Sequence, residues 1–84
     1  SIRLVWLMAR AENGLILYNG QSKGDFVELA LVNGFVQYSF NLGGSSNNSG
    51  AVSIRSISPL TLGHWHRVVI GRKIKEGSLQ VDDQ

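Results

Sequence analysis

Apolar and polar residues alternate over short runs along this chain, which is the pattern of half-buried β-strands. The longest example is the segment 26–41, where two alternating runs flank Asn33-Gly34. Asn-Gly favours a type I′ turn, because both central residues of that turn need a positive φ. The segment is therefore predicted to be a β-hairpin in which Val32 pairs with Phe35 and the numbers of each pair sum to 67.

This register separates the side chains of the hairpin into two faces, since alternate residues point to the same side of a strand. One face is wholly apolar and carries Val27, Leu29, Leu31, Val36, Tyr38 and Phe40. The other face is mixed and carries Phe26, Glu28, Ala30, Val32, Phe35, Gln37 and Ser39. We expect the first face to form the core and the second to be partly in contact with water.

The other segments are also short and rich in strand-forming residues. In residues 1–8, one alternating set contains Ile2, Leu4, Trp6 and Met8, and the other contains Arg3, Val5 and Leu7. Further strands are predicted in 15–20, 51–57, 64–74 and 78–83, with turns at Asn13-Gly14, at Asn19-Gly20 and at residues 75–77. No segment has a sustained helical period. The chain is therefore predicted to be all-β, an antiparallel sandwich of two sheets.

Composition narrows the function classes. The 84 residues are enough for one domain, and the net charge of +2 is too small to indicate nucleic-acid binding. The chain has no cysteine, which excludes disulfides and thiolate metal sites within it. No apolar run approaches the roughly 18 residues of a membrane-spanning helix.

A candidate metal site lies at the end of the hairpin that is remote from its turn. Continuing the register outward places Asp25 opposite Leu42, so the carboxylate of Asp25 and the backbone carbonyl of Leu42 are expected side by side at the rim of the sheet. Two such oxygens suit a hard cation such as Ca²⁺. The alternative is that Asp25 is an ordinary turn residue after Gly24.

The histidines and serines give only weak indications of a zinc site or a catalytic site. His64 and His66 flank Trp65, but the chain has no further histidine or cysteine to complete a zinc site. We interpret this segment as a tryptophan that anchors the core, with two histidines at the rim. No spacing of nucleophile and base stands out, so the chain is not expected to be an enzyme.

Basic residues are densest in the segment 67–75. Arg67, Arg72, Lys73 and Lys75 lie there, and Arg55 is a further candidate. On a strand, Arg67, Lys73 and Lys75 share one side and Arg72 takes the other. The segment is either a solvated face or a contact for sulfated glycans, which Arg and Lys bind as they bind phosphate. In addition, Asn47-Asn48-Ser49 is an N-glycosylation sequon, with Asn47 as acceptor in a secreted protein.

Three stretches together resemble a known family. "GLILYNG", "DFVELALVNGFVQYSFNLG" and "HWHRVVIGRKIKEGSLQVD" are similar to successive signatures of laminin G-like domains of the agrin, perlecan and pikachurin type. The resemblance implies a lectin-like jelly roll of two antiparallel sheets. It also implies that residues 1–84 are the N-terminal part of the domain, which is incomplete at the C-terminus because the last strands follow Gln84.

The same resemblance implies a function. In calcium-binding members, an Asp and a main-chain carbonyl at the positions of Asp25 and Leu42 ligate the ion. The chain is thus expected to be a secreted adhesion module that binds a glycosaminoglycan or a glycosylated receptor such as dystroglycan in a calcium-dependent way. The alternative is a structural spacer domain of an extracellular matrix protein, without a ligand of its own.

Overall fold

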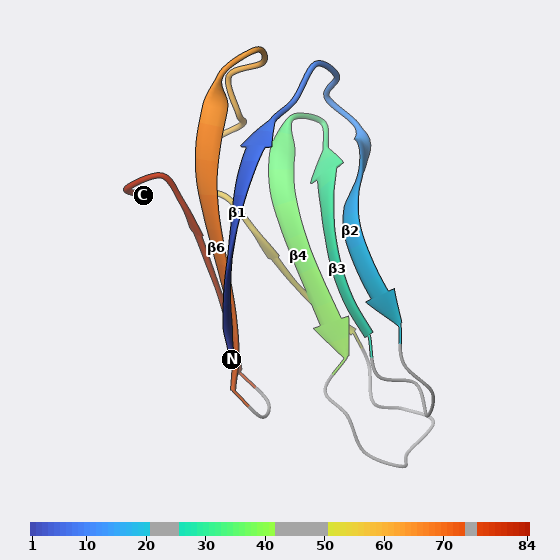
Figure 1. Cartoon of the computed structure of the whole chain (residues 1–84). Coiled ribbons are helices and arrows are strands. Elements are labelled where there is room, and N and C mark those ends of the chain that lie inside the picture. The colour runs from blue at the N-terminus through green and yellow to red at the C-terminus, as the bar shows by residue number, and fades with distance from the viewer. Residues whose placement is uncertain (21–25, 42–50, 74–75) are drawn as a thin grey trace.

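The computed structural model describes residues 1–20, 26–41, 51–73 and 76–84 (Figure 1). These residues form strands and no helix. The strands are β1 Ile2–Met8, β2 Gly14–Gly20, β3 Phe26–Val32, β4 Phe35–Asn41, β5 Ala51–Arg55, β6 Trp65–Lys73 and β7 Glu76–Val81.

The strands form two antiparallel sheets that pack face to face. One sheet has the order β1-β6-β7 and the other has the order β2-β3-β4-β5. Figure 1 shows β1 and β6 in one layer and β2, β3 and β4 in the other. The predicted all-β sandwich of two antiparallel sheets is confirmed.

The central hairpin has the predicted register. Val32 pairs with Phe35 and Val27 pairs with Phe40, so every pair of β3 and β4 sums to 67. Asn33 has φ of 52° and Gly34 has φ of 88°, as a type I′ turn requires. The backbone N–H of Asn33 also donates to Oδ1 of Asn13, 2.9 Å away, which ties this turn to the loop before β2.

The core forms where the apolar face of the hairpin meets the inner face of the other sheet. Five of the six predicted residues are buried, namely Leu29, Leu31, Val36, Tyr38 and Phe40. Val27 is only partly buried and packs against them. The opposite sheet contributes Val68, Ile70 and Val81 to the same cluster.

The segment between β5 and β6 closes the end of the sandwich at the Asn33-Gly34 turn. Leu60 is 7% exposed, and its N–H donates to the carbonyl of Gly34 at 2.8 Å. The N–H of Gly63 donates to the carbonyl of Ala9, also at 2.8 Å. The first bond ties the segment to the turn of the four-stranded sheet and the second ties it to the end of β1 in the other sheet, so the segment covers the core at this end.

Three sequence predictions are wrong in detail. Asn19 and Gly20 are not a turn but pair with Val27 and Phe26, because the β2–β3 ladder continues to the end of both strands. Likewise, Glu76 and Gly77 belong to β7, where they pair with Lys73 and Arg72.

The third error concerns Trp65, which is 64% exposed and does not anchor the core. Strand β6 buries Val68 and Ile70, so the period of two turns Trp65 to the opposite, outer face of the sheet. His66 consequently points inward, between β6 and the turn that follows β7.

Candidate functional site

The candidate site lies at the end of the sandwich remote from the Asn33-Gly34 turn, which we call the rim. The described strand ends that form the rim are those of β1 at Ile2, β2 at Gly20, β3 at Phe26, β4 at Asn41, β5 at Ala51, β6 at Lys73 and β7 at Glu76. Figure 1 shows these ends together at the bottom of the molecule. Ends of both sheets therefore frame one surface.

The proposed calcium ligands, Asp25 and Leu42, lie outside the described residues. Their neighbours in the sequence, Phe26 and Asn41, are joined to each other, because the N–H of Phe26 donates to Oδ1 of Asn41 at 3.0 Å. Asn41 is only 6% exposed. A buried amide side chain therefore fixes the ends of β3 and β4 just where the proposed ligands begin.

Asn41 was not among the site residues predicted from the sequence, although the register of the hairpin indicates that it lies opposite Phe26. The sum of 67 pairs position 41 with position 26, and Asn is uncommon inside strands. A polar residue at the last pair of a hairpin is thus a candidate for tying the two strand ends together.

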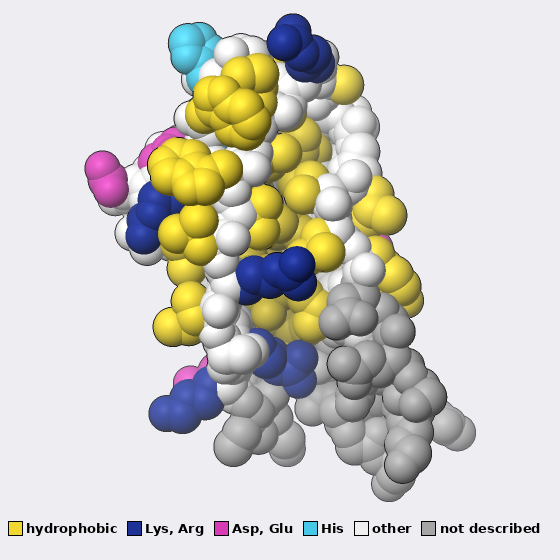
Figure 2. Space-filling view, viewed as in Figure 1, with side chains coloured by type: hydrophobic (Ala, Val, Ile, Leu, Met, Phe, Trp, Pro, Cys, Tyr) yellow, Lys and Arg dark blue, Asp and Glu magenta, His cyan; other side chains and the backbone are white. Residues whose placement is uncertain are grey.

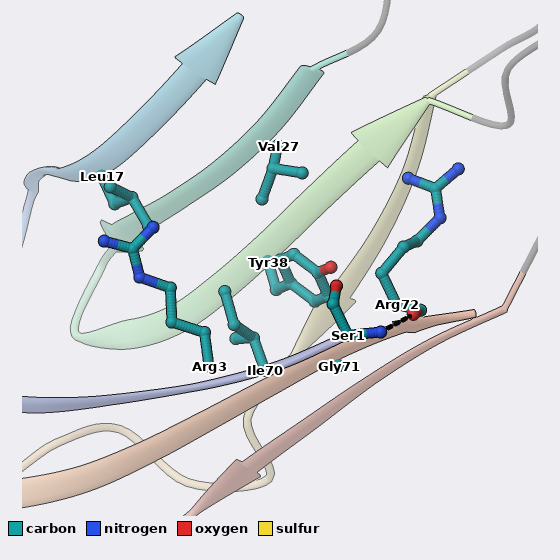
Figure 3. A pocket seen from close by; sticks show the side chains of 8 residues that line it. All are labelled: Ser1, Arg3, Leu17, Val27, Tyr38, Ile70, Gly71 and Arg72. Atoms are coloured by element: carbon teal, nitrogen blue, oxygen red, sulfur yellow. Dashed lines mark hydrogen bonds between the residues drawn. The ribbon is translucent and has the colours of Figure 1, made fainter. Parts of the chain in front are cut away.

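A cavity of about 180 Å³ opens between the sheets beside the rim (Figure 3). Leu17, Val27 and Tyr38 line it from one sheet, and Arg3, Ile70 and Arg72 line it from the other. Burial raises the pKa of the Tyr38 phenol above its usual value of 10.0, and the charge of Arg72 opposes this rise. The phenol is thus protonated at neutral pH and can donate a hydrogen bond.

The cavity also contains a residue that sequence reasoning assigned no role. Arg3 points inward from β1 together with Val5 and Leu7, because its cross-strand partner is the buried Ile70. Figure 3 shows its guanidinium group extending across the space between the sheets toward Leu17. The sequence carried no clear signal for this, since both alternating sets of β1 contain apolar residues.

The basic segment does not form one cluster. Arg72 faces inward, with its guanidinium carbon 4.5 Å from the centroid of the Phe40 ring. Lys73 is exposed and takes the outer side, as does Arg67. The six residues between Arg67 and Lys73 correspond to about 20 Å along a strand. The structure therefore brings Arg72 and Lys73 to the rim and leaves Arg67 near the opposite end of β6.

The remaining candidates lie elsewhere. Arg55 donates to Oε1 of Gln37 at 2.8 Å on the outer side of the four-stranded sheet, whereas β6 belongs to the other sheet. Lys75 and Asn47 lie outside the described residues. Within the described ranges, His, Asp and Glu do not gather into groups of three that could hold a metal ion.

His66 is engaged in a structural contact. Its Nδ1 lies 2.7 Å from Oδ2 of Asp82, and its Nε2 lies 3.0 Å from the carbonyl oxygen of Thr61. Both ring nitrogens thus have oxygen partners within the protein. His64 is exposed in the preceding turn.

Comparison with known proteins identifies relatives over most of the chain. The profile of the laminin G domain matches residues 7–84. Mouse basement membrane-specific heparan sulfate proteoglycan core protein is 45% identical over 73 residues, which are 83% of this chain and 2% of that protein. Human pikachurin is 40% identical over 73 residues, which are 86% of this chain and 7% of that protein. Human protein eyes shut homolog is 46% identical over 79 residues, which are 86% of this chain and 2% of that protein.

The chain spans between 2% and 7% of the length of these relatives. Like these relatives, it is an extracellular module. No helix long and apolar enough to cross a membrane occurs in the part of the chain that the structure describes. The profile match covers more than nine-tenths of the sequence and agrees with the two antiparallel sheets. The chain therefore belongs to the laminin G domain family.

Proposed function

We propose that this extracellular module binds an anionic glycan at the rim in a calcium-dependent way. The observation that carries the proposal is the Phe26–Asn41 hydrogen bond, which holds the ends of β3 and β4 together directly beside Asp25 and Leu42 in the sequence. Arg72 and Lys73 add positive charge at the same end of the sandwich.

The donor chemistry fits a hard cation. Asp25 would supply a carboxylate oxygen and Leu42 a backbone carbonyl oxygen, which are the ligand types that Ca²⁺ prefers. When bound, the ion would offer its remaining coordination positions to water and to carboxylate, sulfate or hydroxyl oxygens of a glycan. Because Ca²⁺ usually takes six to eight oxygens, these two groups alone leave most of the shell to the ligand and the solvent.

The partner that we propose is a glycosaminoglycan or a glycosylated receptor such as dystroglycan. One of the relatives is by name the core protein of a heparan sulfate proteoglycan. Lys73 is exposed at the rim and is available to a sulfate group.

Calorimetric titration with Ca²⁺ tests the metal site. The native protein should bind Ca²⁺, and Asp25→Asn, which keeps the size of the side chain and removes its charge, should bind it at least about tenfold more weakly. Asp83→Asn is the matched control, because it removes an exposed carboxylate after β7 and should leave the affinity unchanged. Equal affinity of the native protein and Asp25→Asn for Ca²⁺ would mean that Asp25 is not a calcium ligand.

Retention on a heparin column tests the glycan. Retention should fall when EDTA replaces Ca²⁺ in the buffer, and Asp25→Asn should behave in Ca²⁺ as the native protein behaves in EDTA. If the protein passes through the column unretained in both buffers, the module is a structural spacer without a glycan ligand of this class.

A further inference from the structure

The segment of residues 56–64, between β5 and β6, covers one end of the core without forming a helix or a strand. We call this segment the cap. Figure 1 shows it at the same end of the sandwich as the turn between β3 and β4. Leu60 is the one residue of the cap that is buried in the core, so hydrogen bonds carry much of its attachment. Three N–H groups of the cap donate at 2.8 Å to carbonyls outside it: Ser56 to Val36, Leu60 to Gly34 and Gly63 to Ala9.

His66 adds a side-chain tie between the cap and the turn that follows β7. Nε2 of its ring lies 3.0 Å from the carbonyl oxygen of Thr61 in the cap, and Nδ1 lies 2.7 Å from Oδ2 of Asp82. A carbonyl oxygen and an ionised carboxylate accept hydrogen bonds and cannot donate them. The imidazolium has an N–H on each ring nitrogen, whereas the neutral imidazole has only one. The ring can therefore bond both partners only while it is charged.

We propose that the charge of His66 fastens the cap, which is closed while the ring is protonated and opens locally when the ring is neutral. The single proton of the neutral ring stays on Nδ1, because a hydrogen bond to a carboxylate is about twice as strong as one to a neutral oxygen. Nε2 then directs a lone pair at the carbonyl oxygen of Thr61, so the tie becomes a repulsion between two acceptors. Segments held by few buried contacts are the first to open in a folded protein.

Within the described residues, one charged group acts on the ring of His66 from the elements packed around it. That group is Asp82, whereas β1 contributes the apolar Leu7, which pairs with His66 across the sheet. The other ionisable residues at this end are exposed or lie on the outer side of the sheet: Arg10, Glu12, His64, Arg67 and Asp83. The hydrogen bond with Asp82 raises the pKa of His66 above 6.5, although partial burial of the ring opposes the rise. Stabilisation from the charged ring is lost as pH rises through this raised pKa, so the cap should open above pH 6.5.

The cap lies at the end of the sandwich opposite the rim. Figure 2 shows histidine at the upper end of the molecule, with acidic side chains below it on the same side. The three residues of the tie, His66, Asp82 and Thr61, all lie within the described ranges and include no proposed calcium ligand. The proposal is therefore independent of glycan and calcium binding at the rim, and its experiments are done in EDTA.

Hydrogen exchange measured by NMR tests the proposal on the native protein. The readouts are the N–H groups of Leu60 and Gly63, which bond to residues outside the cap, and the ring resonances of His66. The protection factor is the measured exchange rate corrected for the intrinsic rate at each pH. Between about pH 6 and about pH 8.5, the protection of both amides should fall about tenfold, the size expected for the loss of one hydrogen bond. The midpoint of this fall should coincide with the midpoint at which the ring of His66 titrates.

Urea separates opening of the cap from unfolding of the whole protein. A local opening exposes little surface, so it responds weakly to low concentrations of urea, whereas global unfolding responds strongly. The amides of Leu60 and Gly63 should therefore be less protected than the amides of the β3–β4 ladder and less sensitive to urea. Equal protection and equal urea dependence in the two sets would show that the cap does not open by itself, and would overturn the proposal.

Variants identify the titrating group. His66→Gln cannot change charge, so the protection of the cap should no longer depend on pH. Asp82→Asn should reduce the pH dependence, because an amide can donate to Nδ1 and leave the proton of the neutral ring on Nε2 for Thr61, and Asn also tolerates the φ of 53° at this position. His64→Gln removes the exposed histidine of the cap and is the matched control, which should keep the native profile. A pH-dependent fall in protection that persists unchanged in His66→Gln, or that is absent from the native protein, contradicts the proposal.

Discussion

Nδ1 of His66 lies 2.7 Å from Oδ2 of Asp82 and joins the start of β6 to the turn that follows β7. Asp82 adds two further bonds, since its N–H donates to the carbonyl of Arg67 and its Oδ1 accepts from the N–H of Arg67. Asp82 has φ of 53°, in the left-handed region that Asp tolerates better than most residues. Asp82 therefore continues the ladder between β6 and β7 beyond its last pair, Val68 with Val81, and His66 holds the carboxylate of Asp82 in place.

The charge of this pair makes stability depend on pH. The hydrogen bond with Asp82 raises the pKa of His66 above 6.5, partial burial opposes this, and the bond to the carbonyl of Thr61 raises it further. The same bond, together with the N–H of Arg67, lowers the pKa of Asp82 below 3.8. Since Oδ2 of Asp82 and the carbonyl oxygen of Thr61 are both acceptors, the geometry favours the doubly protonated imidazolium.

The first prediction follows from the signs of these shifts. The stabilisation that His66 provides is complete below pH 6.5 and is lost as pH rises through the raised pKa of His66. The stabilisation that Asp82 provides is lost as pH falls through the lowered pKa of Asp82. Urea unfolding at a series of pH values should show the free energy of unfolding declining as pH rises above about 6.5 in the native protein and declining less in His66→Gln. The control His64→Gln changes an exposed ring and should keep the native profile. Identical profiles for His66→Gln and the native protein would contradict the role of the pair.

The second prediction concerns the hairpin core. Leu29 is fully buried, so Leu29→Ala should reduce the free energy of unfolding by about 2–5 kcal/mol through lost burial and a cavity. Glu28→Ala, the adjacent position on the outer side, should change it by about 0.5 kcal/mol or less. Urea unfolding measures both. The reverse order would mean that the strand is shifted by one residue.

The third prediction concerns Gly77 in β7. A Cβ at this position would overlap the ring of Phe40, which is 1% exposed, so the buried ring would have to shift. Gly77→Ala should therefore cost about 1–3 kcal/mol of stability by overpacking. Gly14→Ala is the control, since nothing lies within 4 Å of a Cβ there. Equal thermal midpoints of the two variants would show that β7 packs differently against β4.

The fourth prediction separates the two cations at the rim. Lys73 is exposed, so Lys73→Gln should lower the salt concentration at which the protein elutes from heparin and leave its unfolding midpoint unchanged. Arg72 lies over the Phe40 ring at 4.5 Å, so Arg72→Gln should also reduce stability, by about 0.5–2 kcal/mol. If Lys73→Gln elutes from heparin at the same salt concentration as the native protein, Lys73 does not contact the glycan.

The sequence by itself determined the hairpin and the class of fold. Asn33-Gly34 fixes the turn, because few other residue pairs accept a positive φ at both positions, and the turn fixes the register of β3 and β4. Strict alternation then fixes which face is apolar, since a strand has a period of two. These are local properties of the backbone, and a single segment contains all the information that they need.

Only the tertiary structure decided which face of β1 and β6 is buried. Both alternating sets of β1 contain apolar residues, and the structure turns Arg3 inward while Trp6 points outward. The tie between Phe26 and Asn41, the cavity at Tyr38 and the exposure of Trp65 depend in the same way on where one sheet lies against the other. The functions of Asp25, Leu42, Asn47 and Lys75 stay predictions. Burial is a property of two surfaces in contact, so a strand with two apolar faces acquires its inner side only when the opposite sheet, which is distant in sequence, packs against it.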